Sequence, residues 1–161
     1  MADTGLTRVL FVCTGNICRS PTAEGVFRQR LQELGLHDRV ETDSVGTHGF
    51  HVGSAPDRRS QAAARQRGID ISDLRARQFT LSDFAYFDYI LAMDQDNLDI
   101  LLAEAPAEHR AKVHLFMDFA RDPAVREVPD PYYGGDQGFE RVFELIENAT
   151  TGLIGHLQKG Q

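Results

Sequence analysis

A short apolar strand pattern runs directly into a cysteine-containing loop and then into a helix pattern. The apolar run is 9–12, and residues 13–21 read Cys-Thr-Gly-Asn-Ile-Cys-Arg-Ser-Pro. Free backbone N–H groups and the positive end of a helix dipole converge at such a junction and bind oxyanions. The same positive field favours the thiolate form of Cys13. The segment therefore predicts a site that binds a phosphate group and attacks it with a cysteine.

Strand and helix patterns alternate along the rest of the chain. Strands are expected at 8–13, near 40–44, at 89–93 and at 113–116. Helices are expected at 21–35 with Ser20 as N-cap, at 56–68, after Thr80, at 97–105 after the cap Asp94, and at 139–157, with 122–138 as a loop. This order implies one domain over residues 1–161, an α/β three-layer α/β/α sandwich around a central four-stranded parallel sheet. Ligands of such sheets bind beyond the carboxyl ends of the strands, where Cys13 is expected.

The acidic net charge restricts the partners of the chain. The 161 residues carry a formal net charge of −7, which disfavours nucleic acid and anionic membranes as partners. An anionic substrate must therefore be held by a local positive site. No apolar run reaches membrane-spanning length, the first residues lack a secretory pattern, and there are only two cysteines. We therefore expect a cytoplasmic protein, and a monomer because no interaction helix is evident.

The loop residues after Cys13 suit phosphoryl transfer. Gly15 and Asn16 tolerate the backbone angles with which a loop curls its amides around one centre. Arg19 offers a planar fork of donors that matches two phosphate oxygens. These groups would bind the three equatorial oxygens and leave phosphorus open to in-line attack by the Cys13 sulfur. Ser20 can hydrogen-bond the thiolate and help to expel it when the phosphocysteine is hydrolysed.

A leaving alkoxide or phenoxide also needs a proton donor. The best candidate is Asp130, because the prolines on either side of it stiffen its loop. After the first step its carboxylate could activate a water molecule. Tyr132, Tyr133 and Phe50 could form the walls of a deep, aryl-sized pocket. Such a pocket favours phosphotyrosine, whose length brings its phosphorus to a buried thiolate.

Two motifs resemble those of the low-molecular-weight protein tyrosine phosphatases. They are Val-Cys-Thr-Gly-Asn-Ile-Cys-Arg-Ser-Pro at 12–21 and Asp-Pro-Tyr-Tyr-Gly at 130–134. The resemblance covers nearly the whole chain and implies hydrolysis of phosphotyrosine and small aryl phosphates, without metal or cofactor. It implies that Cys13 is the nucleophile, Arg19 the phosphate clamp and Asp130 the general acid. The implied phosphate-binding loop also contains Thr14, Gly15, Asn16, Ile17, Cys18 and Ser20.

The same resemblance implies supporting roles around the loop. Asn16, Ser20 and Ser44 would hold the loop in shape, and Cys18 could form a reversible, protective disulfide with Cys13. Family members often carry a histidine in the segment after the second helix, tied to the loop asparagine and serine. Residues 71–75 read Ile-Ser-Asp-Leu-Arg and contain no histidine. The support of the loop is therefore expected to be rearranged. Phe50 lies at a variable position linked to substrate choice.

Two alternatives to a tyrosine-phosphoprotein phosphatase share the loop pattern. An arsenate reductase would use the same fold, although that chemistry usually relays electrons through more cysteines than Cys13 and Cys18. A phosphoprotein-binding module would bind the phosphate group of a phosphoprotein without cleaving the phosphate ester. For a phosphatase, inorganic phosphate is expected to be both the product and an inhibitor. The presence of nucleophile, clamp and acid together argues against the binding module. The six histidines show no metal-ligand spacing, and no catalytic role is expected of them.

Overall fold

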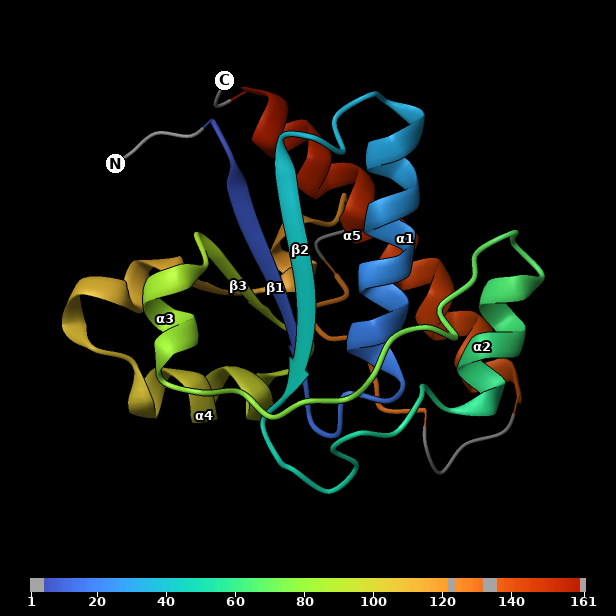
Figure 1. Cartoon of the computed structure of the whole chain (residues 1–161), viewed down its shortest axis with the longest axis horizontal. Helices are drawn as coiled ribbons and strands as arrows, with labels where there is room; N and C mark the ends of the chain where they lie inside the picture. Colours follow the sequence, from blue (N-terminus) through green and yellow to red (C-terminus); the bar gives the residue numbers. More distant parts are fainter. Residues whose placement is uncertain (1–4, 122–123, 132–135, 160–161) are drawn as a thin grey trace.

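A parallel sheet of four strands organises the molecule (Figure 1). The computed structural model describes all residues except 1–4, 122–123, 132–135 and 160–161. The strands are β1 (Thr7–Cys13), β2 (Val40–Gly46), β3 (Tyr89–Ala92) and β4 (Val113–Leu115), in the order β2-β1-β3-β4. The chain leaves β1 toward β2 on one side and later returns to β3 on the other. The carboxyl end of β1 is therefore the switch point where ligands of such sheets bind.

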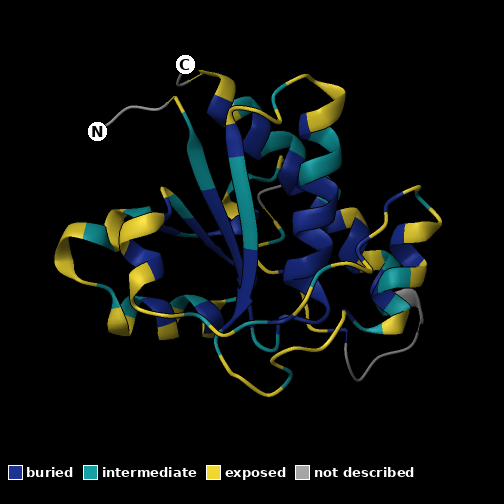
Figure 2. Cartoon of the chain, in the orientation of Figure 1, coloured by how far each residue is buried: buried dark blue, intermediate teal, exposed yellow. Residues whose placement is uncertain are grey.

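Helices cover both faces of the sheet. On one face lie α1 (Arg19–Glu33), α2 (Arg58–Arg65) and α5 (Asp136–Lys159); on the other lie α3 (Ser82–Tyr86) and α4 (Gln95–Glu104). Alternate residues of β1 face opposite layers, so Phe11 packs on Phe27 and Phe116 in one core, whereas Leu10 belongs to the second. The burial colours mark the carboxyl-terminal part of β1 and the N-terminal turns of α1 as buried (Figure 2). The predicted three-layer α/β sandwich is confirmed.

Several element boundaries differ from those predicted. The strand predicted at 113–116 ends at Leu115, because residues 116–119 form a short 3-10 helix after another at 107–112. Helix α2 begins after Asp57, whose carboxylate accepts from the Arg59 N–H at 2.8 Å. Asp94 caps α4 as predicted, accepting from the Asn97 N–H at 2.8 Å. Helix α5 begins at Asp136, within the segment predicted as a loop.

The start of α1 also corrects a prediction. The helix begins at Arg19, its N-cap is Cys18, and no side chain caps it. Ser20, the expected N-cap, lies inside the first turn and directs its hydroxyl to the sulfur of Cys13, 3.0 Å away. A hydroxyl held in that contact does not cap the helix, so the N–H groups of this first turn are not satisfied by Ser20.

Gly152 lets α5 approach the 3-10 helix that follows β4. A Cβ at this position would lie 1.6 Å from the carbonyl oxygen of Phe119, whereas a Cβ at Gly155 would meet nothing within 4 Å. We expect Gly152→Ala to lower the free energy of unfolding by about 3 kcal/mol, because backbone must move. Gly155→Ala should raise it by about 0.5–1 kcal/mol through helix propensity. Urea unfolding checks both; equal changes in the two variants would contradict the close approach.

Candidate active site

The loop after β1 curls around the sulfur of Cys13. Cys13 is the last residue of β1 and is buried. Asn16 adopts a left-handed backbone conformation with φ of 58°, and its N–H points to the Cys13 sulfur at 3.3 Å. The segment at the end of β2 holds the start of the loop, because the N–H of Thr47 donates to the carbonyl of Cys13 at 2.8 Å. This support needs Gly46, where a Cβ would lie 2.7 Å from the Thr14 carbonyl oxygen.

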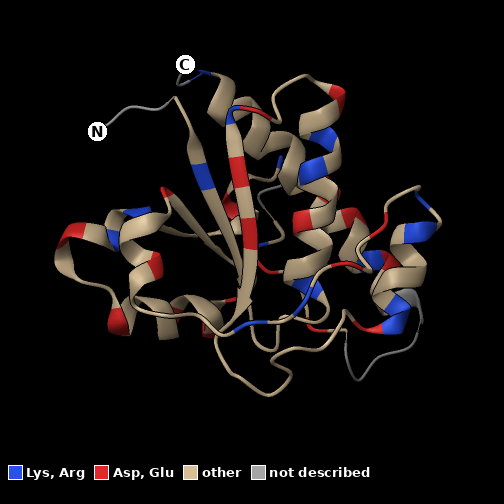
Figure 3. Ribbon diagram, viewed as in Figure 1, with Lys and Arg blue, Asp and Glu red and all other residues tan. Residues whose placement is uncertain are grey.

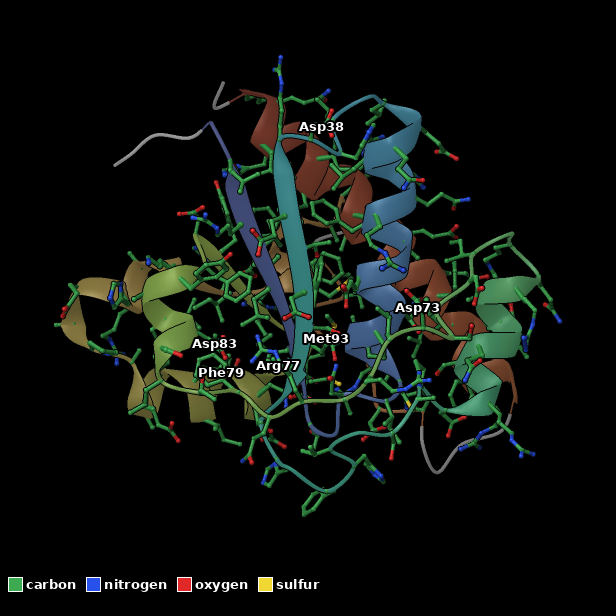
Figure 4. All side chains as sticks on the ribbon, in the orientation of Figure 1. Asp38, Asp73, Arg77, Phe79, Asp83 and Met93 are labelled. Carbon is green, nitrogen blue, oxygen red and sulfur yellow. The ribbon has the colours of Figure 1, made fainter. Side chains whose placement is uncertain are left out.

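A buried network around the Asn16 side chain joins the loop to β2. The Asn16 Nδ2 donates to the hydroxyls of Ser20, at 2.8 Å, and Ser44, at 3.0 Å. Its Oδ1 accepts from the backbone N–H of Arg77 at 3.0 Å, which fixes the orientation of the amide. Arg77 lies where the segment before α3 passes the end of β2 (Figure 4). The structure thus brings together the three residues expected to hold the loop in shape.

Arg19 is a buried cation with a rigidly held guanidinium. Its Nη1 donates to Asp94 Oδ2 at 2.6 Å and to the Val128 carbonyl at 3.1 Å, and its Nη2 donates to Thr14 Oγ1 at 3.3 Å. Burial opposes the charge, but the neighbouring Cys13, Asp94 and Asp130 outweigh it and raise the pKa of Arg19. Asp94 was predicted only as a helix cap. Asp94 follows a buried strand directly and so lies at the ligand-binding edge of the sheet. This position is the sequence signal that could have predicted its contact with Arg19.

One cavity of about 200 Å³ unites the predicted nucleophile, clamp and acid. Asp130 approaches from the loop before α5, with its Oδ2 3.7 Å from Arg19 Nη2. The cavity is lined by Cys13, Thr14, Gly15, Ile17, Cys18, Arg19, Phe50, His51 and Asp130. Asn16 and Ser20 lie behind it and support it. Tyr132 and Tyr133, predicted as pocket walls, lie outside the described residues.

His51 lines the cavity beside Phe50, although no role was predicted for a histidine from the sequence. Phe50 is 71% exposed and stacks on His48 with ring centroids 4.9 Å apart. His51 lines the cavity, and its Cδ2 would lie 3.0 Å from a Cβ at Gly15. No role was expected for a histidine here, because its sequence spacing gives no hint that the loop after β2 folds over the loop after β1.

The two cysteines differ in environment although both are free thiols. The Cys13 sulfur accepts from the Asn16 N–H at 3.3 Å and lines the same cavity as Arg19. Burial, with help from the nearby charges of Asp57 and Cys13, raises the pKa of Cys18 to about 12. The Cys18 thiol therefore stays protonated at neutral pH, which leaves Cys13 as the candidate nucleophile.

The described part of the chain contains neither a cluster of metal-ligating side chains nor a membrane-spanning helix. Within residues 5–121, 124–131 and 136–159, no three His, Cys, Asp or Glu side chains are grouped so that they could hold a metal ion. No helix in this part of the chain has both the length and the apolar character needed to cross a membrane.

Comparison with known proteins identifies the class that this fold and cavity define. The model of the family described as "Low molecular weight phosphotyrosine protein phosphatase" matches residues 8–161. A low molecular weight protein-tyrosine-phosphatase of Streptomyces coelicolor is 47% identical over 157 residues, covering 94% of each chain. The human low molecular weight phosphotyrosine protein phosphatase is 41% identical over 145 residues, covering 89% of this chain and 91% of the human one.

A solved structure leads to the same family. The protein tyrosine phosphatase of Entamoeba histolytica, crystallised with Hepes in its active site, superposes with a TM-score of 0.92 at 42% identity and covers 96% of this chain and 98% of its own. The chain belongs to the low molecular weight phosphotyrosine protein phosphatases. It is therefore a cysteine-based, metal-independent protein-tyrosine phosphatase that acts through a phosphocysteine intermediate.

Proposed function

We propose that Cys13, Arg19 and Asp130 carry out this hydrolysis in the cavity that they share. The observation that carries the proposal is their convergence on one cavity of about 200 Å³ from the end of β1, the start of α1 and the loop before α5. The Cys13 thiolate attacks phosphorus, a P–S bond forms, and the bond to the leaving oxygen breaks. Asp130 gives its proton to that oxygen, and its carboxylate then takes a proton from the water that hydrolyses the phosphocysteine.

The loop and its supports stabilise the charge that develops in this reaction. The amides of residues 14–19 and the guanidinium of Arg19 bind the equatorial oxygens, which leaves the axial line from sulfur to leaving group open. Ser20, at 3.0 Å from the sulfur, donates a hydrogen bond to the thiolate both before attack and when it is expelled. Because these donors are held by the Asn16 network, little reorganisation accompanies the reaction.

We propose a tyrosine-phosphorylated protein as substrate, bound through the exposed Phe50 and the neighbouring His51. A buried sulfur can be reached only by a phosphate on a long side chain, and the aryl ring of such a side chain can pack against the exposed Phe50 ring that lines the cavity. We further propose that residues 1–161 act as one monomeric domain, since β1 and α5 share one core. Two buried, free cysteines support a reducing compartment such as the cytoplasm.

Metal-free hydrolysis of aryl phosphates by the purified chain tests the proposal directly. We expect release of phosphate from phosphotyrosine in the presence of a chelator, with inorganic phosphate as a competitive inhibitor. Reduction of arsenate coupled to thiol consumption, without ester hydrolysis, would instead indicate a reductase. Tight binding of a phosphopeptide without turnover would indicate a binding module. Either result would overturn the proposed function.

The role of Asp130 can be separated from simple binding by the choice of leaving group. We expect Asp130→Asn to lower kcat about 10²–10⁴-fold with phenyl phosphate, because the phenoxide then leaves without a proton. The loss should be much smaller with an acidic nitrophenol as leaving group. Steady-state kinetics with both esters checks this. The matched control is Asp38→Asn, an exposed aspartate at the opposite end of the sheet (Figure 4). Equal losses of Asp130→Asn with both esters would contradict the acid role.

A further inference from the structure

A buried carboxylate outside the cavity ends the hydrogen-bond network of the catalytic loop. Glu24 lies on α1 and is only 5% exposed. Its Oε1 accepts a hydrogen bond from the Ser44 hydroxyl at 2.8 Å. Ser44 in turn accepts from the Asn16 amide, which also donates to Ser20. Glu24 is therefore connected to the Cys13 sulfur through four successive hydrogen bonds, and the proposed mechanism gives it no task.

The direction of these hydrogen bonds follows from the Asn16 amide. Its oxygen is occupied by the Arg77 N–H, so its two amide hydrogens serve Ser20 and Ser44. Each hydroxyl accepts one of them and must send its own hydrogen elsewhere. The Ser44 hydrogen goes to Glu24. The Ser20 hydrogen can go to the Cys13 sulfur at 3.0 Å or to the Val45 carbonyl at 3.3 Å.

We infer that Glu24 is a positioning residue that fixes the donor and acceptor roles in these hydrogen bonds. This inference rests on the proposed role of Cys13 as nucleophile. An ionised carboxylate can only accept, so it holds Ser44 as donor toward Glu24 and as acceptor toward Asn16. The Asn16 amide then keeps both of its hydrogens on the serine hydroxyls, which leaves the Ser20 hydrogen for the thiolate. A protonated Glu24 could donate to Ser44 and compete with Asn16 for its oxygen, which would loosen the network.

The segment that lacks the expected histidine lies against the same stretch of α1. A Cβ at Gly25, next to Glu24, would lie 2.4 Å from Ile71 Cγ2, so this segment packs directly on the helix. Asp73, labelled in Figure 4 on the segment that crosses α1, reaches Arg28 at 3.7 Å. No histidine side chain is available in residues 71–75 to end the network. From Asn16 through Ser44, the network ends at the Glu24 carboxylate.

The charges around Glu24 make its role depend on pH. Burial raises the pKa of Glu24 to about 7; the hydrogen bond from Ser44 and the charge of Arg28 oppose the rise, and Asp43 and Asp73 add to it. These groups come from β2, from α1 itself and from the segment after α2; the ribbon in Figure 3 marks acidic residues in red along β2 and basic residues in blue on α1. The ionised form that only accepts is therefore the majority form above about pH 7 and the minority form below it.

The experiment compares Glu24→Gln with the wild-type chain at two pH values. The control, Glu33→Gln, makes the same exchange at an exposed position of the same helix. Because the variant resembles the protonated glutamate, we expect the wild-type to variant ratio of kcat/KM to be near one at about pH 5.5 and to rise about five- to tenfold at about pH 8. For Glu33→Gln the ratio stays near one at both pH values. A ratio for Glu24→Gln that does not change with pH would overturn the inference, because it would show a structural effect alone.

Two further measurements separate failure of this inference from failure of the proposed function. The ultraviolet absorbance of the Cys13 thiolate needs no turnover, and we expect it to be weaker in Glu24→Gln than in wild type at about pH 7.5; equal absorbance contradicts the role of Glu24. In a Ser44→Ala background the link is cut, so Glu24→Gln should cause no further pH-dependent loss. A further loss there would show that Glu24 acts by another route. Absence of aryl phosphate hydrolysis in the wild type would count against the proposed function alone.

Discussion

A Cys13→Ser variant is expected to lose at least about 10⁴-fold in turnover of phosphotyrosine while it still binds inorganic phosphate. Serine supplies no ionised nucleophile at neutral pH, and no other described residue presents a thiolate to the cavity. The loop amides and Arg19 stay in place, because the backbone of β1 and the bonds of Arg19 to Asp94 and Val128 do not depend on the sulfur. Steady-state kinetics gives the first quantity and calorimetric titration with phosphate the second.

The matched control for this prediction is Cys18→Ser, the same exchange five residues on in the same loop. Cys18 lines the cavity, but burial holds its thiol protonated, with a pKa of about 12. We therefore expect a far smaller loss than in Cys13→Ser. Equal losses in the two variants would show that the loop tolerates no serine and that the loss says nothing about the nucleophile. Loss of phosphate binding in Cys13→Ser would contradict a cradle made of backbone amides and Arg19.

The sequence was sufficient for the layers of the fold because burial patterns there are local. Residues 9–12 are apolar throughout, as a parallel strand covered on both faces must be, and all four are buried. The signal for the loop from Cys13 to Arg19 is also local in sequence, because Cys13 ends β1 and Arg19 begins α1. Asp130 was predicted from the prolines that flank it and from the resemblance to a known family, and the structure brings it to the same cavity.

What the sequence could not give depends on contacts between distant segments. Ser20 fits the N-cap pattern by its residue type, yet the nearby sulfur holds its hydroxyl. Asp94 reaches Arg19 across 75 residues, and Glu24 reaches Ser44 across 20, so neither contact leaves a periodic signal. A glutamate on an apolar helix face is the one sign that could have singled out Glu24, because a buried carboxylate needs a partner.

An Arg19→Lys variant is expected to lose about 10³-fold or more in kcat/KM, although the charge is kept. The guanidinium has enough donors to bind Asp94 and the Val128 carbonyl through one nitrogen and still present its remaining N–H groups to the phosphate. A lysine ammonium is a single centre. Asp94, whose Oδ2 lies 2.6 Å from the arginine, would draw it away from the phosphate oxygens. Kinetics with phosphotyrosine should show a higher KM and a lower kcat together.

The choice of lysine makes this prediction sharper than truncation to alanine would. Alanine would leave Asp94 without its buried cation, so lost activity could reflect a distorted loop. Lysine keeps a cation beside Asp94, and urea unfolding should show that most of the stability remains. Arg30→Lys is the matched control, because Arg30 lies on the same helix and bonds Thr151 at 3.0 Å, away from the cavity. Near-normal activity of Arg19→Lys would mean that charge alone is sufficient, and that the two-pronged geometry held by Asp94 and Val128 does not contribute to catalysis.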